Sequence, residues 1–216
     1  MFILTKENSI ASQYIGELRD VSIQKDRMRF RKNLERLGEI LAYEVSKGLN
    51  YSTKTIKTPL EEAPVQNLAE QPVLISVLRA AVPFYQGFCN IFDRADSGFV
   101  GAYRKEESSG SDKIEIDFLY QAMPNLTDRD VILVDPMLAT GQSFVKTIQN
   151  LLKNGNPRNI HIVSVIAAPE GIEYIQKHAG HKVQFWIGAV DKGLNDQFYI
   201  VPGLGDAGDL SFGPKL

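Results

Sequence analysis

The segment from residue 131 to residue 143 combines residue types that could bind a phosphate group. It reads VILVDPMLATGQS: an apolar run ends in Asp135, and a turn with Thr140, Gly141 and Ser143 follows. This order predicts a buried strand, a tight loop and the start of a helix. Glycine and small hydroxyl residues leave backbone N–H groups accessible there, and the helix dipole adds partial positive charge. We therefore expect a phosphate-bearing ligand at this loop.

Asp135 stands where the predicted strand ends, which is where open α/β sheets place their ligands. A carboxylate there can accept hydrogen bonds from two neighbouring hydroxyl groups, as on a ribose. The segment lacks the Gly-Lys-Ser/Thr of a Walker motif and the G-x-G-x-x-G of a dinucleotide fold. A strand that ends in Asp before a glycine turn also occurs without such a ligand, so this motif alone leaves the function open.

Two further polar segments could complete a site. Residues 105–112, KEESSGSD, lie between two predicted strands and fit either a surface hairpin or a lid over an active site. Residues 202–214 carry four glycines and fit either a frayed tail or a ligand-binding loop. Arg79 follows a predicted strand and Arg104 precedes the first polar segment. Either arginine could equally form a solvated ion pair at the surface.

Strand and helix patterns alternate along the chain from residue 72 onward. Short apolar or alternating runs predict strands at 73–78, 99–103, 114–118, 131–134, 160–167 and 183–187, and helical spacing predicts helices at 83–92, 144–153 and 172–178. This alternation favours an α/β fold with a mostly parallel central sheet and helices on both faces. Before it we predict N-terminal helices at 9–19 and 25–47, a strand at 51–58, and a loop marked by Pro59 and Pro64.

Composition narrows the class of protein. The 216 residues suffice for a single domain, taken as residues 1–216, and 44% hydrophobic with 23% charged residues is ordinary for a globular protein. The formal net charge of −2 gives no sign of a nucleic-acid or anionic-membrane surface. Cys89 is the single cysteine, which favours a reducing compartment. No run approaches the roughly 20 apolar residues of a membrane span, so we expect a cytoplasmic protein.

The chain resembles the type I phosphoribosyltransferases, and within them the uracil-specific branch, in motifs that match in order and spacing. These motifs are LRA at 78–80, YRKEE at 103–107, DPMLATGQS at 135–143, AAPEG at 167–171, DKGLN at 191–195 and YIVPGLGDAGD at 199–209. The N-terminal RFRKNLERLGEILAYEV is also similar to the family's opening helix. The resemblance covers essentially the whole chain. It implies pyrimidine salvage, in which the 5-phosphoribosyl group of phosphoribosyl pyrophosphate (PRPP) passes to uracil and gives UMP and pyrophosphate.

The resemblance implies roles for residues of this chain. Those implied to bind PRPP are Arg79, Arg104, Asp135, Pro136, Met137, Leu138, Ala139, Thr140, Gly141, Gln142, Ser143 and Asp206. Those implied to bind uracil are Ile200, Gly205, Asp206 and Ala207 in the C-terminal base-binding loop. Arg79, Arg104 and Asp206 are implied to be catalytic, and no residue stands out as a general base for the uracil N1 proton. Guanidinium forks suit pyrophosphate oxygens, and a glycine-rich loop can bring backbone groups close to a base.

The resemblance also implies partners for the chain. Magnesium is the implied cofactor, carried by PRPP without an assigned protein ligand. PRPP and uracil are the expected small-molecule substrates, with no nucleic acid and no membrane. A homodimer or a higher homo-oligomer is implied as well. GTP is a candidate effector, although no segment offers a place for it.

Three positions depart from the family pattern. Gln142 replaces a usual glycine in the phosphate loop, and Ser76 and Ala81 replace a proline and a glycine around LRA. If the backbone needs a positive φ at residue 81, a Cβ there would cost roughly 1 kcal/mol. The departures motivate a second hypothesis, a non-catalytic nucleotide sensor with the same fold. A third hypothesis is a phosphoribosyltransferase for another base.

Other polar residues fit structural roles. Asp191 and Asn195 flank a Gly-Leu pair and fit simple turn residues. The three histidines lie outside every matched motif, and we expect packing or surface roles for them: His161, His178 and His181.

Overall fold

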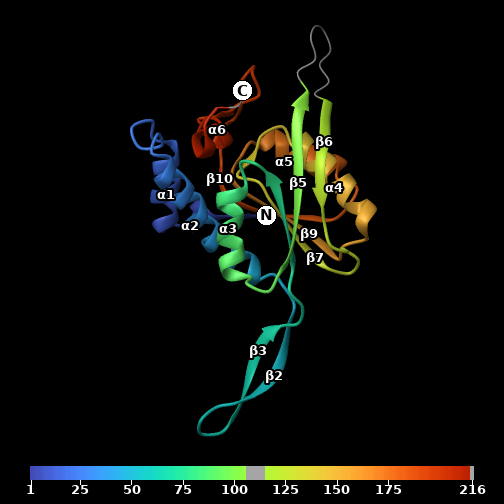
Figure 1. Cartoon of the computed structure of the whole chain (residues 1–216). Coiled ribbons are helices and arrows are strands. Elements are labelled where there is room, and N and C mark those ends of the chain that lie inside the picture. The colour runs from blue at the N-terminus through green and yellow to red at the C-terminus, as the bar shows by residue number, and fades with distance from the viewer. Residues whose placement is uncertain (106–114, 215–216) are drawn as a thin grey trace.

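The computed structural model describes residues 1–105 and 115–214, with the backbone alone at 102–105 and 115–119. A mixed sheet forms its centre, in the strand order β1-β10-β9-β7-β4-β5-β6 with β8 beside β9 (Figure 1). The strands are β1 (Phe2–Ile3), β4 (Val73–Leu78), β5 (Asp96–Lys105), β6 (Glu115–Ala122), β7 (Asp130–Val134), β8 (Met137–Leu138), β9 (Asn159–Ala167) and β10 (Val183–Val190). All neighbouring strands in it run parallel except β5 and β6. The predicted α/β fold with a mostly parallel sheet is confirmed.

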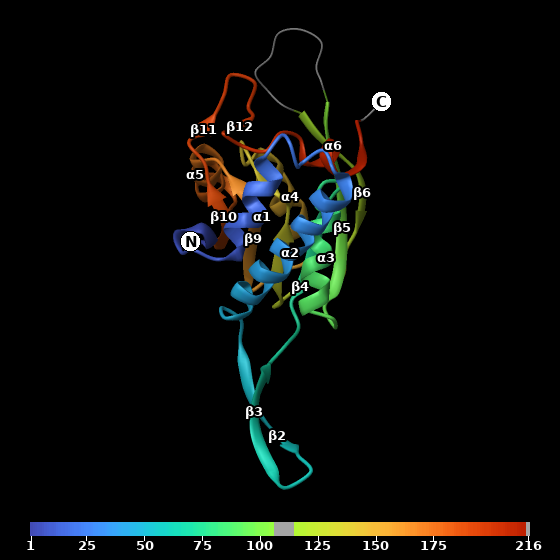
Figure 2. The ribbon, with the colours of Figure 1, turned by 90° about the vertical axis from the view of Figure 1, so that its left-hand side faces the viewer.

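Helices cover both faces of this sheet (Figures 1 and 2). One face carries α1 (Ile10–Arg19), α2 (Arg27–Ser46) and α3 (Val82–Ile91), and the other carries α4 (Gln142–Leu151) and α5 (Pro169–His178). Short 3₁₀ turns occur at Leu4–Lys6 and Leu152–Asn154, and α6 (Ala207–Phe212) lies beyond the ends of the parallel strands. Within the described residues, no helix has both the length and the apolar content that a membrane crossing needs.

The buried strands send alternate side chains into two apolar cores, because successive residues of a strand point to opposite faces. Side chains packed in the core with α2 and α3 include Leu74, Ile132, Val134 and Val163. Those packed in the core with α4 and α5 include Val73, Leu133 and Ile162. Both faces of the sheet are therefore anchored, and the strand ends are held in fixed positions.

A hairpin of β2 (Tyr51–Lys57) and β3 (Glu62–Leu68) projects from the end of the molecule that lies away from α6 (Figures 1 and 2). The predicted strand at 51–58 is confirmed. The predicted loop contains Pro59, but the prediction that Pro64 also lies in it is wrong. Pro64 lies within β3, opposite Thr55. A two-stranded hairpin tolerates proline because each strand has one edge without a ladder partner.

Helices α2 and α3 cross at unusually close range because glycines face each other there. A Cβ on Gly38 would overlap the carbonyl oxygen of Phe84. A Cβ on Gly87 would overlap the carbonyl oxygen of Glu35 and lie 2.6 Å from the backbone nitrogen of Glu39. This contact fixes α3, which begins just after the loop that carries Arg79.

Substitution of Gly87 tests this helix crossing. Gly87→Ala should lower the free energy of unfolding by about 2 kcal/mol, because the added methyl group meets backbone that cannot rotate away. Urea denaturation followed by circular dichroism measures the change. Gly16 in α1 is the matched control: a Cβ there meets nothing within 4 Å. Gly16→Ala should stabilise the chain by about 0.5 kcal/mol; equal effects at the two positions would contradict the crossing contact.

Candidate active site

The residues selected from the sequence lie where the parallel strands of the sheet end. Arg79 follows β4, Asp135 follows β7 and Asp191 follows β10. Arg104 is near the end of β5, with its backbone opposite Ile116 of β6. Because parallel strands end at one edge of a sheet, these positions face a common region.

The loop after β7 is attached along its length to the end of β9. The carbonyl oxygen of Pro136 accepts hydrogen bonds from the N–H groups of Val165 (3.0 Å) and Ile166 (3.1 Å). The carbonyl oxygen of Leu138 accepts one from Ala168 at 2.9 Å. Together with the pairing of β8 and β9, these bonds hold the loop in place without any ligand.

Asp135 and Thr140 shape this loop with their side chains. The N–H of Met137 donates to Asp135 Oδ1 at 3.0 Å, which forms an Asx turn directly after β7. The N–H of Gln142 donates to Thr140 Oγ1 at 3.4 Å. Both carboxylate and hydroxyl groups therefore lie at the turn where the sequence predicts a sugar phosphate.

The helix that follows begins in a way that suits an anion. Gly141 precedes α4 with φ of +76°, a left-handed conformation that favours glycine. Gly141 has no side chain to cap this N-terminus, and among the described residues only the long bond to Thr140 Oγ1 engages the first N–H of the helix. The positive end of the helix dipole and the remaining N–H groups of the first turn suit a phosphate. Gln142 is the first residue of α4, in helical backbone that accepts a side chain, so its departure from the family's glycine causes no strain.

Two glycines press the phosphate loop against α5. A Cβ on Gly141 would lie 2.5 Å from the carbonyl oxygen of Gly171. A Cβ on Gly171 would overlap the carbonyl oxygen of Ala139 and lie 2.5 Å from Leu138 Cδ2. The AAPEG motif is thus explained by packing, because only glycine at its last position allows the loop and α5 to approach this closely.

Arg79 binds the C-terminal segment in this structure. Its Nη2 donates to Asp209 Oδ1 and to the carbonyl oxygen of Gly213, both at 2.8 Å. The side chains of Arg79 and Asp209 are 37% and 39% exposed, so solvent screens the pair and a ligand can reach it. The Leu78–Arg79 peptide bond is cis.

The departures at Ser76 and Ala81 are accommodated by the fold. Ser76 is fully buried within β4, where its hydroxyl has no hydrogen-bond partner among the described residues. Ala81 is fully buried and has φ of −72° and ψ of −18°, a helical conformation open to any residue. Because φ is negative at residue 81, its Cβ does not carry the cost in free energy that a positive φ would impose.

The C-terminal segment is ordered rather than frayed, and part of it is helical. Asp206 caps α6, where its Oδ1 accepts a hydrogen bond from the Asp209 N–H at 2.9 Å. Ile200 is in β12 (Ile200–Val201), which pairs with β11 (Gly193–Leu194). Of the two alternatives for residues 202–214, the frayed tail is wrong, and the ligand-binding loop stays a prediction, with α6 forming part of the segment.

The predicted uracil residues divide by exposure. Ile200 and Ala207 are buried, with side chains in the apolar core next to α2. Gly205 and Asp206 are exposed, and Gly205 has φ of +90°. Since the side chains of Ile200 and Ala207 are committed to packing, only their backbone groups can serve a base.

The sequence missed one important role at this edge. Asn195 is a turn residue as predicted, because its Oδ1 accepts from the N–H groups of Gln197 (3.0 Å) and Tyr199 (2.9 Å). Asp191 is not, because its carboxylate pairs with Arg19 of α1 at 2.6 Å. The Gly-Leu pair between them is strand β11 and not a turn.

Part of the predicted site lies outside the described residues. The backbone of Arg104 belongs to β5, but its side chain lies outside the described residues, as do residues 106–112 of the predicted lid. The binding role of Arg104 and the lid therefore stay predictions.

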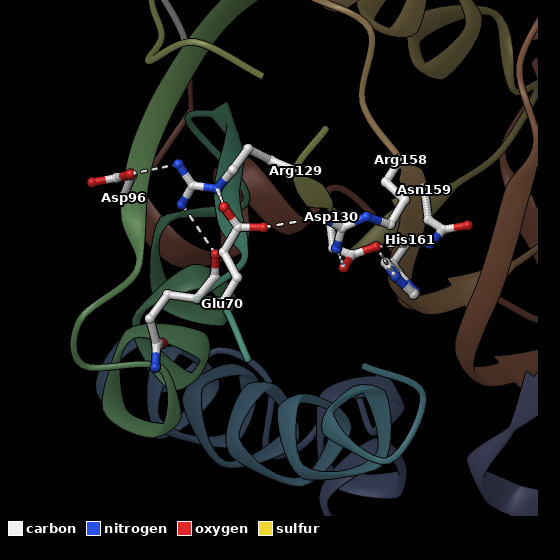
Figure 3. A network of polar contacts seen from close by, with 8 residues as sticks. Glu70, Asp96, Arg129, Asp130, Arg158, Asn159 and His161 are labelled. Carbon is white, nitrogen blue, oxygen red and sulfur yellow. Dashed lines mark hydrogen bonds and ion pairs between the residues drawn. The ribbon is translucent and has the colours of Figure 1, made fainter. Parts of the chain in front are cut away.

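The buried histidine belongs to a polar network at the other edge of the sheet (Figure 3). Trp186 Nε1 donates to His161 Nδ1 at 3.1 Å, and His161 Nε2 lies 3.9 Å from Asp130 Oδ1. His161, Asn159 and Arg158 together lower the pKa of Asp130 below its usual range, against the effect of burial. Because Asp130 and Asn159 begin β7 and β9, this network lies far from the phosphate loop. The packing role predicted for His161 is confirmed.

Comparisons with known proteins agree on one family. Residues 5–214 match the family model described as uracil phosphoribosyltransferase. A uracil phosphoribosyltransferase of Porphyromonas gingivalis is 45% identical over 213 residues, which cover 99% of this chain and 98% of that protein. One of Pyrococcus furiosus is 39% identical over 207 residues, covering 94% of this chain and 86% of that protein.

Solved structures agree on the fold. A protein of Aquifex aeolicus superposes with a TM-score of 0.86 and 30% identity, covering 99% of this chain and 98% of that one. A hypoxanthine phosphoribosyltransferase of Staphylococcus aureus superposes with a TM-score of 0.50 and 12% identity, covering 91% of this chain and 92% of that one. At that identity the second similarity concerns the fold alone.

Substitution of Gly171 tests the phosphate loop. Gly171→Ala should raise the Kd for ribose 5-phosphate about tenfold, because the new methyl group displaces the backbone of Ala139. Isothermal titration calorimetry measures the affinity. Gly16→Ala adds the same group in open space and should leave the affinity unchanged. Normal binding by Gly171→Ala would show that the loop does not hold the sugar phosphate.

Proposed function

Because the chain belongs to the uracil phosphoribosyltransferase family, we propose that it transfers the 5-phosphoribosyl group from PRPP to uracil and releases UMP and pyrophosphate. One observation carries the proposal beyond the family match. The anion-binding loop at the start of α4, Arg79 and the C-terminal glycine segment all lie at one edge of the sheet. That edge offers groups for each of the three parts of the reaction: sugar phosphate, pyrophosphate and base.

The sugar phosphate belongs at the loop after β7. Asp135 would accept hydrogen bonds from the ribose hydroxyls, and residues 136–143 would surround the 5′-phosphate. The N–H groups at the start of α4 and the helix dipole stabilise that negative charge. Because the loop is already attached to β9 and packed on α5, little ordering is needed when PRPP binds.

The base belongs at the C-terminal segment. Backbone groups of Ile200, Gly205 and Ala207 would meet the carbonyl and N–H groups of uracil. Cytosine would place an amino donor against a backbone donor, and the two unpaired polar groups would disfavour it. Asp206 would lie between base and PRPP, since its carboxylate is exposed at the start of α6.

The chemical step transfers the anomeric carbon from oxygen to nitrogen. The bond between that carbon and pyrophosphate breaks with both electrons on the leaving oxygen, the bond to uracil N1 forms, and N1 gives up its proton. Arg79 and Arg104 would stabilise the charge that collects on pyrophosphate. Arg79 donates from Nη2 to a carboxylate and a carbonyl oxygen, and a guanidinium carries five N–H donors, which supports a further bond to pyrophosphate.

Magnesium fits this site as a partner of the substrate. Among the described residues no cluster of three or more His, Cys, Asp or Glu side chains could hold a metal ion. Asp135 and Asp206 offer the hard oxygen donors that Mg²⁺ takes one or two at a time, with phosphates and waters as its other ligands. When bound with PRPP, magnesium would neutralise part of the pyrophosphate charge.

We also propose the remaining expectations from the resemblance. Residues 1–216 would act as one phosphoribosyltransferase domain in the cytoplasm, assembled as a homodimer or larger. The projecting β2–β3 hairpin supports an assembly, since all of β2 is exposed and the hairpin leaves Tyr51, Ile56 and Leu60 uncovered in the single chain. GTP as an effector remains a proposal of the same kind. The non-catalytic sensor loses its motivation, because Ala81 and Gln142 both fit their backbone without strain.

A base panel tests the proposed reaction. Purified protein with PRPP and Mg²⁺ should convert radiolabelled uracil to UMP at least about 100-fold faster than it converts cytosine, because cytosine leaves polar groups unpaired. Chromatography of the products measures each rate. Faster formation of IMP, AMP or OMP would assign another base. Binding of UMP without any turnover would support the sensor hypothesis instead.

Substitution of Asp206 tests its catalytic assignment. Asn also accepts the N–H that Asp206 accepts at the start of α6, so Asp206→Asn should fold normally. Loss of the negative charge should lower kcat about 100-fold. Steady-state kinetics and a melting curve measure the two effects. Unchanged kinetics with unchanged stability would remove Asp206 from the active site.

A further inference from the structure

The C-terminal base segment is held by side chains that come from elsewhere in the fold. Gly203 lies between Ile200 and Gly205, whose backbone groups the proposed function assigns to uracil. Its N–H donates to Asp191 Oδ2 at 2.9 Å. Its carbonyl oxygen accepts from Arg19 Nη1, also at 2.9 Å. Both backbone polar groups of this residue are therefore bound by side chains.

Arg19 and Asp191 form a two-pronged ion pair across the chain. Arg19 Nη1 donates to Asp191 Oδ2 at 2.8 Å, and Nη2 donates to Oδ1 at 2.6 Å. The Asp191 side chain is 5% exposed and that of Arg19 is 22% exposed. Charge-assisted forks of this kind are strong and fix the relative orientation of the two groups. With Gly203 they close a ring of hydrogen bonds.

Both side chains of the ring are attached to regular elements of the fold, Arg19 to α1 and Asp191 to β9. Arg19 is the last residue of α1. The backbone N–H of Asp191 donates to the carbonyl oxygen of Ala167 at 2.8 Å, which ties it to the end of β9. Gly203 adopts φ of +64°, and a Cβ there would overlap the Ile200 carbonyl oxygen. Only one placement of the segment satisfies these contacts together.

We propose that Arg19 and Asp191 are positioning residues for base recognition: they hold the Gly203 peptide so that the backbone groups of Ile200 and Gly205 meet uracil in register. The inference rests on the proposed function. The proposed function assigns neither side chain to the base or to PRPP, and both bind Gly203 of the base segment, so their effect should appear in uracil binding and spare PRPP. A lysine at position 19 keeps the charge but cannot form the fork or reach three acceptors in one plane.

The chain supplies a matched control for this pair. Arg29 of α2 forms a similar fork with Glu17 of α1, at 2.9 and 2.7 Å, and it contacts no residue of the C-terminal segment in the described part of the chain. Hydrogen bonds from Arg29 and Asn33 lower the pKa of Glu17 to about 2. Arg29→Lys thus removes a comparable fork that also involves α1, through Glu17, without changing a hydrogen bond of the base segment.

Steady-state kinetics of the full chain test the proposal. Arg19→Lys should raise the KM for uracil about tenfold and change the KM for PRPP by less than about twofold. Arg29→Lys should leave both within about twofold, with a similar shift in Tm. Equal changes in the two KM values for Arg19→Lys, or an equal rise in the uracil KM for Arg29→Lys, would overturn the inference.

Two further measurements keep the result decisive. Asp191→Asn keeps an oxygen acceptor for the Gly203 N–H but loses the charge, so it should raise the uracil KM alone, and the double variant should add little to it. Without substrate, hydrogen exchange across residues 200–206 should be faster in Arg19→Lys than in Arg29→Lys, and equal exchange would contradict the ring. If the wild type forms no UMP, the proposed function is overturned. If it forms UMP but Arg19→Lys changes the KM for uracil and the KM for PRPP equally, this inference alone is overturned.

Discussion

Parallel pairing of β4, β7, β9 and β10 is the constraint on which the rest of the molecule depends. Helices α3, α4 and α5 follow β4, β7 and β9 and return the chain along the faces of the sheet, and the parallel pairing brings the carboxyl ends of the strands to one edge. Each strand then delivers one group there: Arg79 after β4, the phosphate loop after β7, the attachment of that loop on β9, and Asp191 after β10. Two apolar cores hold the strands from both faces, so the edge is rigid before any ligand arrives.

The irregular segments at this edge need partners for their backbone, because only the short β8 of the phosphate loop pairs with the main sheet. The phosphate loop finds them in the end of β9, and glycines allow it to approach α5. The C-terminal segment finds them in side chains: Arg19 and Asp191 at Gly203, Arg79 at Gly213, and Arg31, whose Nη1 donates to the Ser211 carbonyl oxygen at 2.7 Å. Arginines therefore carry much of the order around the base segment, and only Arg79 among them is also assigned to substrate.

Local patterns predicted the elements well and the long-range contacts poorly. Continuous apolar runs such as Val73–Leu78 identify buried strands because both faces of the sheet are covered. The sequence does not predict α6, because its six residues include glycine, serine and one acid, and the helix is stabilised by the Asp206 cap and Arg79 instead of by its own pattern. The pattern around Asp191 predicts a turn residue and not an ion pair, because its partner Arg19 is 172 positions away in the chain, a separation that no local pattern reports. Pro64 was read as a loop residue because the sequence does not say that β3 has only one neighbour.

The central claim is that a single ligand joins the phosphate loop and the C-terminal segment at one edge of the sheet. Hydrogen–deuterium exchange of the whole chain with and without UMP tests it directly, since UMP carries both the base and the 5′-phosphate. The account predicts slower exchange at residues 139–145 and at 200–207 in the same titration, with no change in the β2–β3 hairpin. Protection of only one of the two segments, or protection confined to the opposite edge around Asp130 and His161, would contradict it.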